Sequence, residues 1–469
     1  MMRRTKIVCT IGPVSDSEEM IAKLIAAGMN VARLNFSHGT LEYQRDLVRK
    51  IKRVRKALNK PVAILQDLQG PKIRIGVIES GFVRLQPGQE FVLTADDVTG
   101  DGKRASVSFK GLPYEVKIGD PILLADGNIE LRVERVAPPN ICCRVIVGGQ
   151  LSSHKGMNLP ASEVHVQSLT KKDCQDIIVG QEEGVDAIAL SFVRSANDIL
   201  ACRKVIKDSG GNIPIIAKIE KHEAVDNIDS IVAASEAVMV ARGDLGVEID
   251  LEKVPLVQKL IIRKCNALGK PVITATQMLQ RMVDNPRPTR AEATDVANAI
   301  LDGTDAVMLS EETAVGKYPA EAVMMMDRIA RSAEAALDEL KFENIPIDDG
   351  TRNAISRASY FIAKEVGAAA IITPTWSGST ACLVSRFRPK QPILATTPNE
   401  AALDFLSLCW GVVPVSIPPS NTGDDVIRLS IDAARRAGYI ESGQQVIITG
   451  GAPLHVAGKT NFIRVDRVE

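Results

Sequence analysis

A lysine and a glutamate stand two residues apart, Lys218 and Glu220, at the end of an apolar run over residues 213–219. The run has the composition of a buried strand, whose side chains alternate between two faces, so both charges point to the same face. An unpaired charge there would cost several kcal/mol. A second apolar run, over residues 237–241, leads to Asp244. Two carboxylates and an ammonium on neighbouring strand ends suggest a divalent metal and a reaction of an anion.

The chemistry open to these residues follows from their donor atoms. Magnesium prefers hard oxygen ligands and keeps positions open for substrate oxygens, so Glu220 and Asp244 can supply two ligands. Lys218 would face the same substrate, and its charge suits a phosphoryl group in transfer or a developing enolate. Arg33 adds a planar fork of donors that suits phosphate.

Eight short β-branched runs position these residues and alternate with longer amphipathic segments. The runs cover residues 6–11, 30–34, 62–65, 187–190, 213–219, 238–241, 272–275 and 306–309. A helix is expected over residues 15–27, where apolar residues share one face and Gly28 is a stop signal. Eight strand and helix units predict an α/β fold of the (β/α)8 (TIM) barrel type.

In such a barrel the active site forms at the C-terminal ends of the strands. Polar residues do follow most of the predicted strands. They are Arg33, Asn35 and Ser37 after the second, Asp67 after the third, Lys218 and Glu220 at the fifth, Asp244 after the sixth, Thr276 after the seventh and Ser310 after the eighth. We therefore expect these side chains to gather at one end of the barrel.

The chain also divides into domains. The alternation stops at Gly70 and Pro71 and resumes near Ser168, and turn sequences separate short strand-like pieces in between, which predicts an inserted lid domain of small β-barrel type. A further α/β pattern begins after about residue 345. We predict a catalytic barrel of residues 1–70 and 167–345, a β lid of residues 71–166 and a C-terminal α/β regulatory domain of residues 346–469. The barrel then has close to the roughly 250 residues of its class.

Composition narrows the classes of function. Lysine plus arginine (57) balance aspartate plus glutamate (57), so no overall field attracts nucleic acid or an anionic membrane surface. The eight cysteines lack a CxxC pair and zinc-finger spacing, as expected for reduced core cysteines of a cytoplasmic protein. We find no signal-peptide pattern and no apolar stretch of membrane-spanning length, and expect no membrane association.

Several longer stretches carry a resemblance to a known family. They are KIVCTIGP at residues 6–13, RLNFSHG at 33–39, GPKIR at 70–74, KGMNLP at 155–160, IIAKIE at 215–220, MVARGDLGVE at 239–248, TATQM at 274–278 and NPRPTRAE at 285–292. In these stretches and in their order the chain closely resembles the pyruvate kinase family over essentially its whole length. The resemblance implies transfer of the phosphoryl group of phosphoenolpyruvate to ADP, which gives ATP and an enolate that is protonated to pyruvate.

The resemblance also implies a role for each site residue. Glu220 and Asp244 correspond to ligands of Mg²⁺, or of Mn²⁺ in its place, Lys218 to the group that stabilises the transferring phosphoryl and the enolate, and Arg33 to a phosphoryl clamp. Gly243, Asp244 and Thr276 correspond to substrate contacts, Thr276 and Ser310 to candidates for the proton route in either order, and Arg74 and Lys155 to nucleotide-phosphate contacts. A cytoplasmic, glycolytic homotetramer is implied as well.

Many members of the family bind potassium beside the phosphoryl group, with ligands that match Asn35, Ser37, Asp67 and the carbonyl of Leu68. Lys72 stands here where those members have a glutamate, and we predict that its ammonium supplies the charge of potassium, so that potassium is not required. A unit charge at ~4 Å is worth about 4 kcal/mol at an effective dielectric of 20. The alternative is that Lys72 is a solvated hinge residue and potassium still binds.

A second candidate site follows the run at residues 369–372. Hydroxyls, a glycine and the start of a predicted helix form an anion nest there. The family uses this region for phosphorylated allosteric effectors, which implies that an effector phosphate contacts Thr375, Ser377, Gly378, Ser379 and Thr380. The alternative is an ordinary capped turn, and Ser379 stands where some relatives have a basic residue.

Two other functions compete with phosphoryl transfer. One is a metal-dependent aldolase or lyase acting on pyruvate or phosphoenolpyruvate, since a barrel with glutamate, aspartate and magnesium also serves enolate carbon chemistry. The lid with Arg74 and Lys155 argues against it, because such an enzyme needs no nucleotide. The other is a noncatalytic binding protein, which would be expected to have lost Lys218 or a metal ligand.

Overall fold

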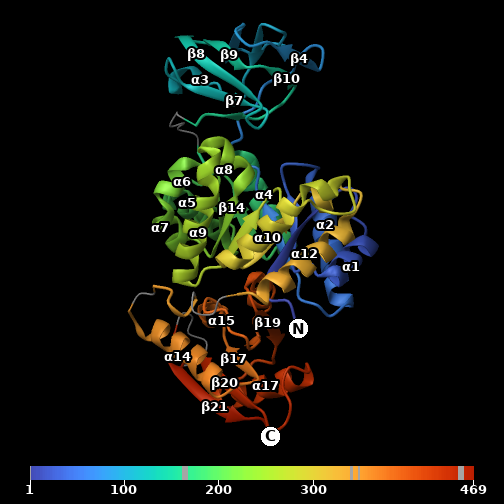
Figure 1. The fold of residues 1–469 in the computed structure, drawn as a ribbon, viewed down its shortest axis with the longest axis vertical. Coiled ribbons are helices and arrows are strands. Elements are labelled where there is room, and N and C mark those ends of the chain that lie inside the picture. Colours follow the sequence, from blue (N-terminus) through green and yellow to red (C-terminus); the bar gives the residue numbers. More distant parts are fainter. Residues whose placement is uncertain (1, 161–166, 338–341, 347–348, 453–458) are drawn as a thin grey trace.

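The computed structural model of the chain describes residues 2–160, 167–337, 342–346, 349–452 and 459–469. Three parts follow one another along its longest axis (Figure 1): the inserted β segment at one end, the helix-covered barrel in the middle and the C-terminal α/β part at the other end. The N-terminus lies between the barrel and the C-terminal part. In the described part of the chain, no helix is both long and apolar enough to cross a bilayer.

The central part is a closed barrel of eight parallel strands, as predicted. The strands are β1 (Lys6–Ile11), β2 (Val31–Asn35), β3 (Ala63–Asp67), β12 (Ala187–Leu190), β13 (Ile215–Ile219), β14 (Ala237–Ala241), β15 (Val272–Ala275) and β16 (Ala306–Leu309). Parallel pairing in register closes the ring, with β1 between β2 and β16. Their carboxyl ends therefore meet at one mouth of the barrel.

Helices cover the outside of the ring and bury the strands. They are α1 (Glu18–Ala27), α2 (Leu41–Ala57), α4 (Lys171–Glu183), α5 (Ala196–Asp208), α6 (His222–Asp226), α7 (Ile228–Ala234), α8 (Arg242–Glu248), α9 (Val254–Leu268), α10 (Arg290–Asp302), α11 (Glu311–Ala314) and α12 (Pro319–Glu334). The helix predicted over residues 15–27 begins at Glu18, because the side chain of Ser17 caps it by accepting from Met20 N. Gly28 ends it with a φ of 126°, which a side chain would disfavour.

The alternation of β13 is what aims the two charges inward. Ile215, Ala217 and Ile219 belong to the apolar layer between strands and helices. Ile216 belongs to a separate apolar cluster inside the barrel. Lys218 and Glu220 continue the series of Ile216, so both side chains turn to the interior at the mouth of the barrel.

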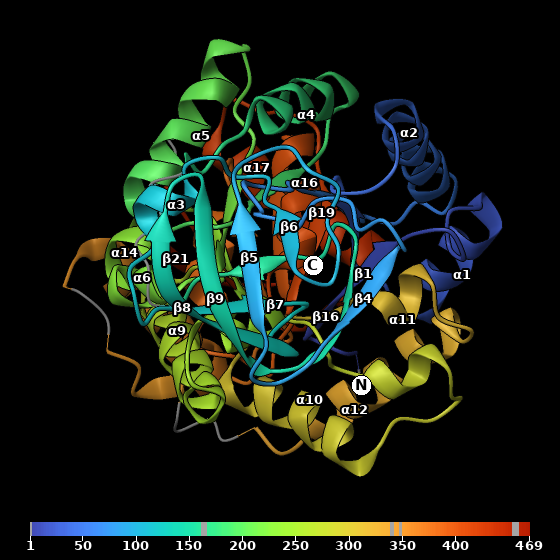
Figure 2. The same cartoon turned by 90° about the horizontal axis from the view of Figure 1, so that it is seen from above.

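The inserted segment is a β domain that follows β3. Its strands are β4 (Phe82–Leu85), β5 (Glu90–Thr94), β6 (Arg104–Ser106), β7 (Pro121–Leu124), β8 (Ile129–Ala137), β9 (Asn140–Val147), β10 (Gly149–Ser152) and β11 (Met157–Asn158), with the short helix α3 (Leu112–Glu115). Six of them form one sheet and β4 with β10 a second, around a shared apolar core. Viewed from above, β5, β8 and β9 lie over the middle of the barrel (Figure 2).

The chain crosses between barrel and β domain twice, and the two crossings pair side by side. Ile75 N donates to Lys155 O, and Met157 N donates to Ile73 O, both at 2.9 Å. We call these two segments, residues 71–75 and 155–160, the hinge. Asn158 of the hinge also donates to Glu248 of α8 at 2.9 Å, so the hinge contacts the mouth of the barrel directly.

The C-terminal part is a five-stranded sheet of β17 (Ala370–Pro374), β18 (Ile393–Thr397), β19 (Val412–Ser416), β20 (Gln445–Gly450) and β21 (Phe462–Arg467). The predicted run at residues 369–372 corresponds to β17, and β21 adds an antiparallel edge. Its helices are α14 (Thr351–Glu365), α15 (Ser379–Ser385), α16 (Glu400–Phe405), the 3₁₀ turn η3 (Leu406–Leu408) and α17 (Gly423–Arg436). Phe405 and Leu408 join the cluster inside the barrel. The C-terminal part therefore closes the end of the barrel opposite the β domain.

The proposed domain boundaries fall near natural breaks. The boundary at residues 70/71 lies just after β3, and that at 345/346 lies between α12 and α14. The end of the predicted lid at residue 166 lies outside the described residues, which resume at residue 167. The residue limits of the three domains stay a prediction.

Candidate active site

Four of the predicted residues form one charged cluster at the mouth of the barrel. Lys218 Nζ lies 2.8 Å from Glu220 Oε1 and 3.0 Å from Asp67 Oδ1. Arg33 Nε donates to Asp67 Oδ2 at 2.6 Å. Asp67 and Glu220 are each only 1% exposed. The two buried carboxylates thus have cationic partners, which is the arrangement that makes buried charge tolerable.

The charge states of the cluster follow from these contacts. Burial by itself would raise the pKa of Asp67, but the charges of Lys218 and Arg33 outweigh it and lower this pKa. Burial lowers the pKa of Lys218, and Asp67 and Glu220 more than restore it, so the net shift is upward. Lys218 is therefore a permanent ammonium at neutral pH.

Glu220 behaves differently. Burial raises its pKa, the nearby charge of Asp244 raises it further, and Lys218 only partly opposes them. A second cation beside Glu220 and Asp244 would relieve this repulsion. Their hard oxygen donors fit Mg²⁺ or Mn²⁺. Within the described ranges no group of three or more His, Cys, Asp or Glu side chains could hold a metal, so other ligands would come from substrate or water.

Lys72 reaches from the hinge to the same carboxylates. Its Nζ lies 3.4 Å from Asp244 Oδ1. Among the ion pairs of the described residues, Lys72 is thus paired with Asp244 and not with Asp67. The structure places its ammonium next to a predicted metal ligand and at the point where the β domain joins the barrel.

The predicted potassium ligands lie at the ends of β2 and β3 or just after them, and three of them have internal partners. Asn35 Oδ1 accepts from Ser37 N at 3.1 Å. The carbonyl of Leu68 accepts from Ser191 Oγ at 2.7 Å. Both oxygens of Asp67 face the cations Arg33 and Lys218. Protein cations and donors therefore already contact three of these predicted ligands.

Gly243 and Thr276 come together as predicted substrate contacts. Gly243 N donates to Thr276 Oγ1 at 2.9 Å. Thr276 has a φ of 70°, a strained value for a β-branched residue. Arg242 holds this conformation by donating to Thr276 O at 2.7 Å. The strained backbone of Thr276 thus lies directly beside the half-buried start of α8.

Ser310 lies at the next strand end but is oriented by a different group. Its backbone N donates to Glu312 Oε2 at 2.7 Å, and Leu279 N donates to Glu312 Oε1 at 3.0 Å. Burial raises the pKa of Glu312. Thr276 Oγ1 donates to Ala275 O at 2.8 Å, so its hydroxyl is engaged next to its own strand.

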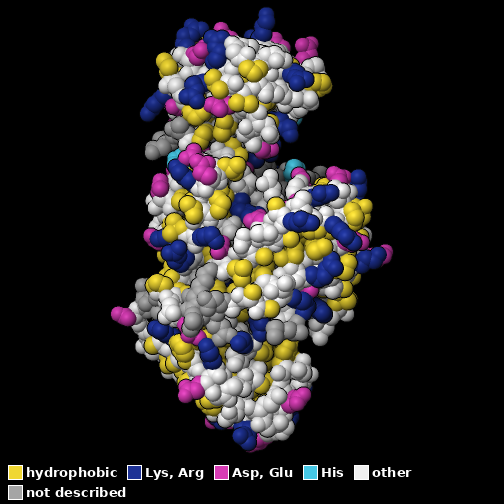
Figure 3. Space-filling model, in the orientation of Figure 1, with side chains coloured by type: hydrophobic (Ala, Val, Ile, Leu, Met, Phe, Trp, Pro, Cys, Tyr) yellow, Lys and Arg dark blue, Asp and Glu magenta, His cyan; other side chains and the backbone are white. Residues whose placement is uncertain are grey.

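Arg74 and Lys155 lie opposite each other in the hinge. Arg74 pairs with Gly156 in an isolated bridge, and its Nη1 donates to His154 O at 3.1 Å. Lys155 is exposed. The surface is indented between the β domain and the barrel (Figure 3).

Sequence reasoning missed several residues that shape the cluster. Ser191 accepts from Lys218 Nζ at 2.7 Å, and Thr10 accepts from Arg33 Nη1 at 2.9 Å. Ser191 directly follows β12, so the strand-end rule that found the others could have found it. Phe192 N donates to Glu220 Oε2 at 2.9 Å. This backbone contact, at a φ of 55°, has no signature in the side-chain types.

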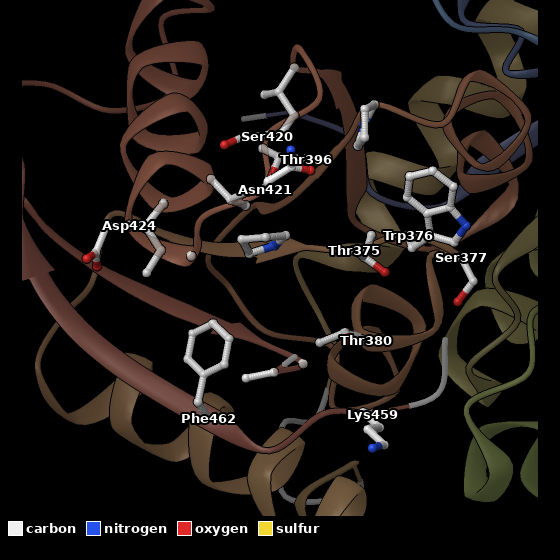
Figure 4. A pocket seen from close by; sticks show the side chains of 18 of the residues that line it. Thr375, Trp376, Ser377, Thr380, Thr396, Ser420, Asn421, Asp424, Lys459 and Phe462 are labelled. Atoms are coloured by element: carbon white, nitrogen blue, oxygen red, sulfur yellow. The ribbon is translucent and has the colours of Figure 1, made fainter. Parts of the chain in front are cut away.

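The predicted effector residues border a cavity of about 560 Å³ in the C-terminal part (Figure 4). Thr375, Ser377, Ser379 and Thr380 line it. Gly378 caps α15 with a φ of 84°, and its N donates to Thr375 Oγ1 at 2.9 Å. The charged lining residues that the structure describes are Lys459 and Asp424, and the other lining residues include hydroxyl side chains together with many apolar ones, such as Trp376, Ile417 and Phe462.

The protein is a (β/α)8 barrel under an inserted β domain, with paired carboxylates and a permanent ammonium at the mouth of the barrel. These features define a class of enzymes that act on anionic substrates with a divalent cation. Comparison with known proteins agrees. Residues 2–323 match the family described as "Pyruvate kinase, barrel domain", and residues 353–466 match "Pyruvate kinase, alpha/beta domain". The chain belongs to the pyruvate kinase family and is a phosphotransferase.

Individual relatives are similar over the full chain. A pyruvate kinase of Clostridium acetobutylicum is 46% identical, with all of both chains covered. A pyruvate kinase of Geobacillus stearothermophilus is 48% identical over 99% of this chain and 80% of its own, and one of Staphylococcus aureus 47% identical over 100% and 81%.

Proposed function

We propose that the cluster around Lys218 transfers the phosphoryl group of phosphoenolpyruvate to ADP, giving pyruvate and ATP as in the last step of glycolysis. The observation that carries this proposal is the position of Lys218 within 3.0 Å of both Asp67 and Glu220. A buried, permanently charged ammonium stabilises negative charge as it moves from the phosphoryl group to the enolate oxygen. Membership of the pyruvate kinase family supports the same reaction.

The neighbouring residues divide the work of binding. Glu220 and Asp244 would hold Mg²⁺ or Mn²⁺, which when bound neutralises phosphoryl charge. Asp67 and Thr10 engage Arg33 Nε and Nη1, and this fixes the guanidinium so that its remaining edge can clamp a phosphoryl oxygen. Asp67 thus orients both cations of the site.

The substrate carboxylate would lie at Gly243 and Thr276, where the start of α8 offers backbone amides. Protonation of the enolate would come from the side of Thr276 or Ser310, at the ends of β15 and β16. Arg74 and Lys155 would contact the nucleotide phosphates when the β domain closes, which would also exclude water from the phosphoryl group.

We further propose that Lys72 replaces the potassium ion of many relatives. Its charge lies 3.4 Å from Asp244, at the edge of the cluster, and Asp67 already has two cationic partners. A fixed ammonium on the hinge would also tie the position of the β domain to the charge of the metal site. The contrasting possibility, that potassium still binds at Asn35, Ser37, Asp67 and Leu68, is an outcome of the test below.

For the rest of the chain we propose a cytoplasmic homotetramer regulated by a phosphorylated metabolite. The hydroxyls of Thr375, Ser377, Ser379 and Thr380, with Gly378, would hold the effector phosphate in the cavity of Figure 4. Titration of phosphoenolpyruvate with sugar monophosphates and AMP tests this site. An unchanged saturation curve would argue that the segment is an ordinary capped turn.

A coupled assay of pyruvate release with and without ADP tests the main proposal. We expect release that requires both ADP and a divalent cation. Turnover that needs no ADP would favour an aldolase or lyase, and a folded chain that forms no product under any of these conditions would favour a binding protein.

A further inference from the structure

Two cysteine side chains meet in the C-terminal part, far from the predicted active site. Cys382 lies on α15 and Cys409 directly follows η3, and their Sγ atoms are 3.1 Å apart. A disulfide joins its sulfurs at about 2.05 Å, so a shift of about 1 Å would allow a bond. The two residues are unequal, because Cys409 is fully buried and Cys382 is partly exposed.

A lysine ammonium lies near each thiol, and that of Lys6 is buried while that of Lys270 is half-buried. Lys6 donates through Nζ to Val412 O at 2.7 Å, and the charge of Cys409 is among those that act on it. Lys270 donates to Ser235 O at 2.6 Å, and the charge of Cys382 acts on it in the same way. The hydrogen bond with Cys382 and burial raise the pKa of Cys409, so Cys409 stays a thiol, and the partly exposed Cys382 is the sulfur that an oxidant reaches first. Lys270 and both cysteines border a small void of about 10 Å³ between the barrel and the C-terminal part.

We propose that Cys382 and Cys409 are a redox site that forms a reversible disulfide when a hydroperoxide is the oxidant. The thiol of Cys382 attacks the peroxide, the O–O bond breaks, and a sulfenic acid and one molecule of water form. The sulfur of Cys409 then attacks the sulfenic sulfur. The S–S bond forms, the S–O bond breaks, and the hydroxyl leaves as water with the proton of Cys409. Two thiols lose two electrons in total, and one peroxide is reduced.

The bond would act on a contact between the barrel and the C-terminal part. A Cβ atom on Gly269, which ends α9, would lie 2.9 Å from Leu383 Cδ2 and 3.6 Å from Cys382 O. Ser385 of α15 donates to Trp410 O at 2.6 Å, one residue after Cys409. α15 therefore packs against the barrel on one side and against the segment after η3 on the other. A covalent link there would suppress local opening of α15, which also carries Ser379 and Thr380 of the predicted effector site.

Treatment of the full-length chain with hydrogen peroxide tests the proposal. Free thiols are alkylated while the protein is unfolded in denaturant, and the digest is mapped by mass spectrometry. We expect a linked pair of peptides containing Cys382 and Cys409, the loss of two alkylatable thiols, and recovery of both with a dithiol. Hydrogen exchange of residues 379–385 should slow in the oxidised protein.

Three variants make the result specific. Cys409→Ser should leave Cys382 as a sulfenic acid that dimedone captures, and Cys382→Ser should leave Cys409 unmodified because it is buried. Cys174→Ser removes the other partly exposed cysteine and should leave the link intact. Full alkylation of Cys382 after oxidation, a link to another cysteine, or unchanged hydrogen exchange in α15 would each overturn the proposal.

Discussion

Lys72 of the hinge lies 3.4 Å from Asp244 at the start of α8, so one ion pair joins the inserted β domain to the mouth of the barrel. Asp244 is also the carboxylate whose charge raises the pKa of Glu220. The ammonium of Lys72 therefore contacts one of the two carboxylates that would hold the divalent cation. This contact links three features: the metal site, the hinge and the need for a monovalent cation.

Replacing Lys72 with glutamate should create a need for potassium. We expect the wild-type chain to turn over without potassium, and Lys72→Glu to lose about 10-fold or more in kcat/KM in its absence, equivalent to about 1.4 kcal/mol. Added potassium should restore much of the lost kcat/KM, because the ion supplies the positive charge that the variant lacks. Initial rates in sodium-free and potassium-free buffer, with and without added potassium chloride, measure the effect.

Lys117→Glu is the matched control, since it makes the same charge change at an exposed position of the β domain. It should leave the rates unchanged in both buffers. Strict potassium dependence of the wild-type chain would contradict the role of Lys72.

Lys218→Met should remove activity and also weaken the fold. Loss of one charge-stabilising donor costs about 100- to 1,000-fold in kcat. Removal of one partner from a buried ion pair costs about 3–5 kcal/mol, and both Asp67 and Glu220 lose a partner here. Assay and thermal melting with circular dichroism measure the two effects separately.

Lys172→Met provides the comparison, because Lys172 also pairs with a buried carboxylate, Asp176, at 2.6 Å but on the outer helix α4. It should lower the melting temperature and leave kcat in place. Retained turnover in Lys218→Met would remove the central assignment.

Magnesium should stabilise the folded chain even without substrate. A ligand at about 100 times its Kd stabilises by about 2.7 kcal/mol, and Glu220→Gln should remove most of this gain. The variant alone should lose some stability, because Lys218 then loses one of its two carboxylate partners, the one at 2.8 Å. Melting temperatures across a magnesium titration give both the stability of each protein without metal and the stabilisation by magnesium.

Glu248→Gln changes another buried carboxylate of the same mouth, one that pairs with Lys221 at 2.7 Å. Its response to magnesium should match that of the wild type. A magnesium shift that persists in Glu220→Gln would place the metal elsewhere.

The contact between barrel and C-terminal part should weaken as the pH rises. Arg55 lies 2.7 Å from Asp186 and 3.1 Å from Asp404 of α16. Burial and then the charge of Asp186 raise the pKa of Asp404 from 3.8 to about 7. A raised pKa means that the folded state holds the proton more tightly, so the stability from this group is fully present below about pH 4 and is lost as the pH passes about 7.

Asp404→Asn should remove the loss of folding stability that ionisation of Asp404 causes at higher pH. We measure the free energy of the first unfolding transition in urea, for this variant and for the wild type, at several pH values between about 5 and about 8. The difference in favour of the variant should grow with pH across this range, by up to about 1–3 kcal/mol. Glu400→Gln, on the exposed side of the same helix, should show little change. A constant difference between Asp404→Asn and wild type across this pH range would show that Asp404 does not titrate there.

Much of the barrel and of its charged cluster was predictable, because local rules govern them. Strand alternation aims Lys218 and Glu220 inward, and the strand-end rule brings Arg33, Asp67 and Asp244 to the same mouth. Ser191 also follows a strand, but serine is common at strand ends, so its residue type did not indicate a functional role. The hydrogen bond from the backbone amide of Phe192 could not be predicted, because every residue type except proline carries the same backbone donor.

Residue types and spacing by themselves determined the eight strand and helix units, the charged residues at their ends and the family. Tertiary structure alone decided that Lys72 meets Asp244 across 172 positions of the chain, that Cys382 meets Cys409, and that Phe405 and Leu408 close the far end of the barrel. The reason is physical. Periodicity and propensity act over a few neighbouring residues, whereas ion pairs, thiol contacts and pKa values depend on which distant segments pack together and how fully they exclude water.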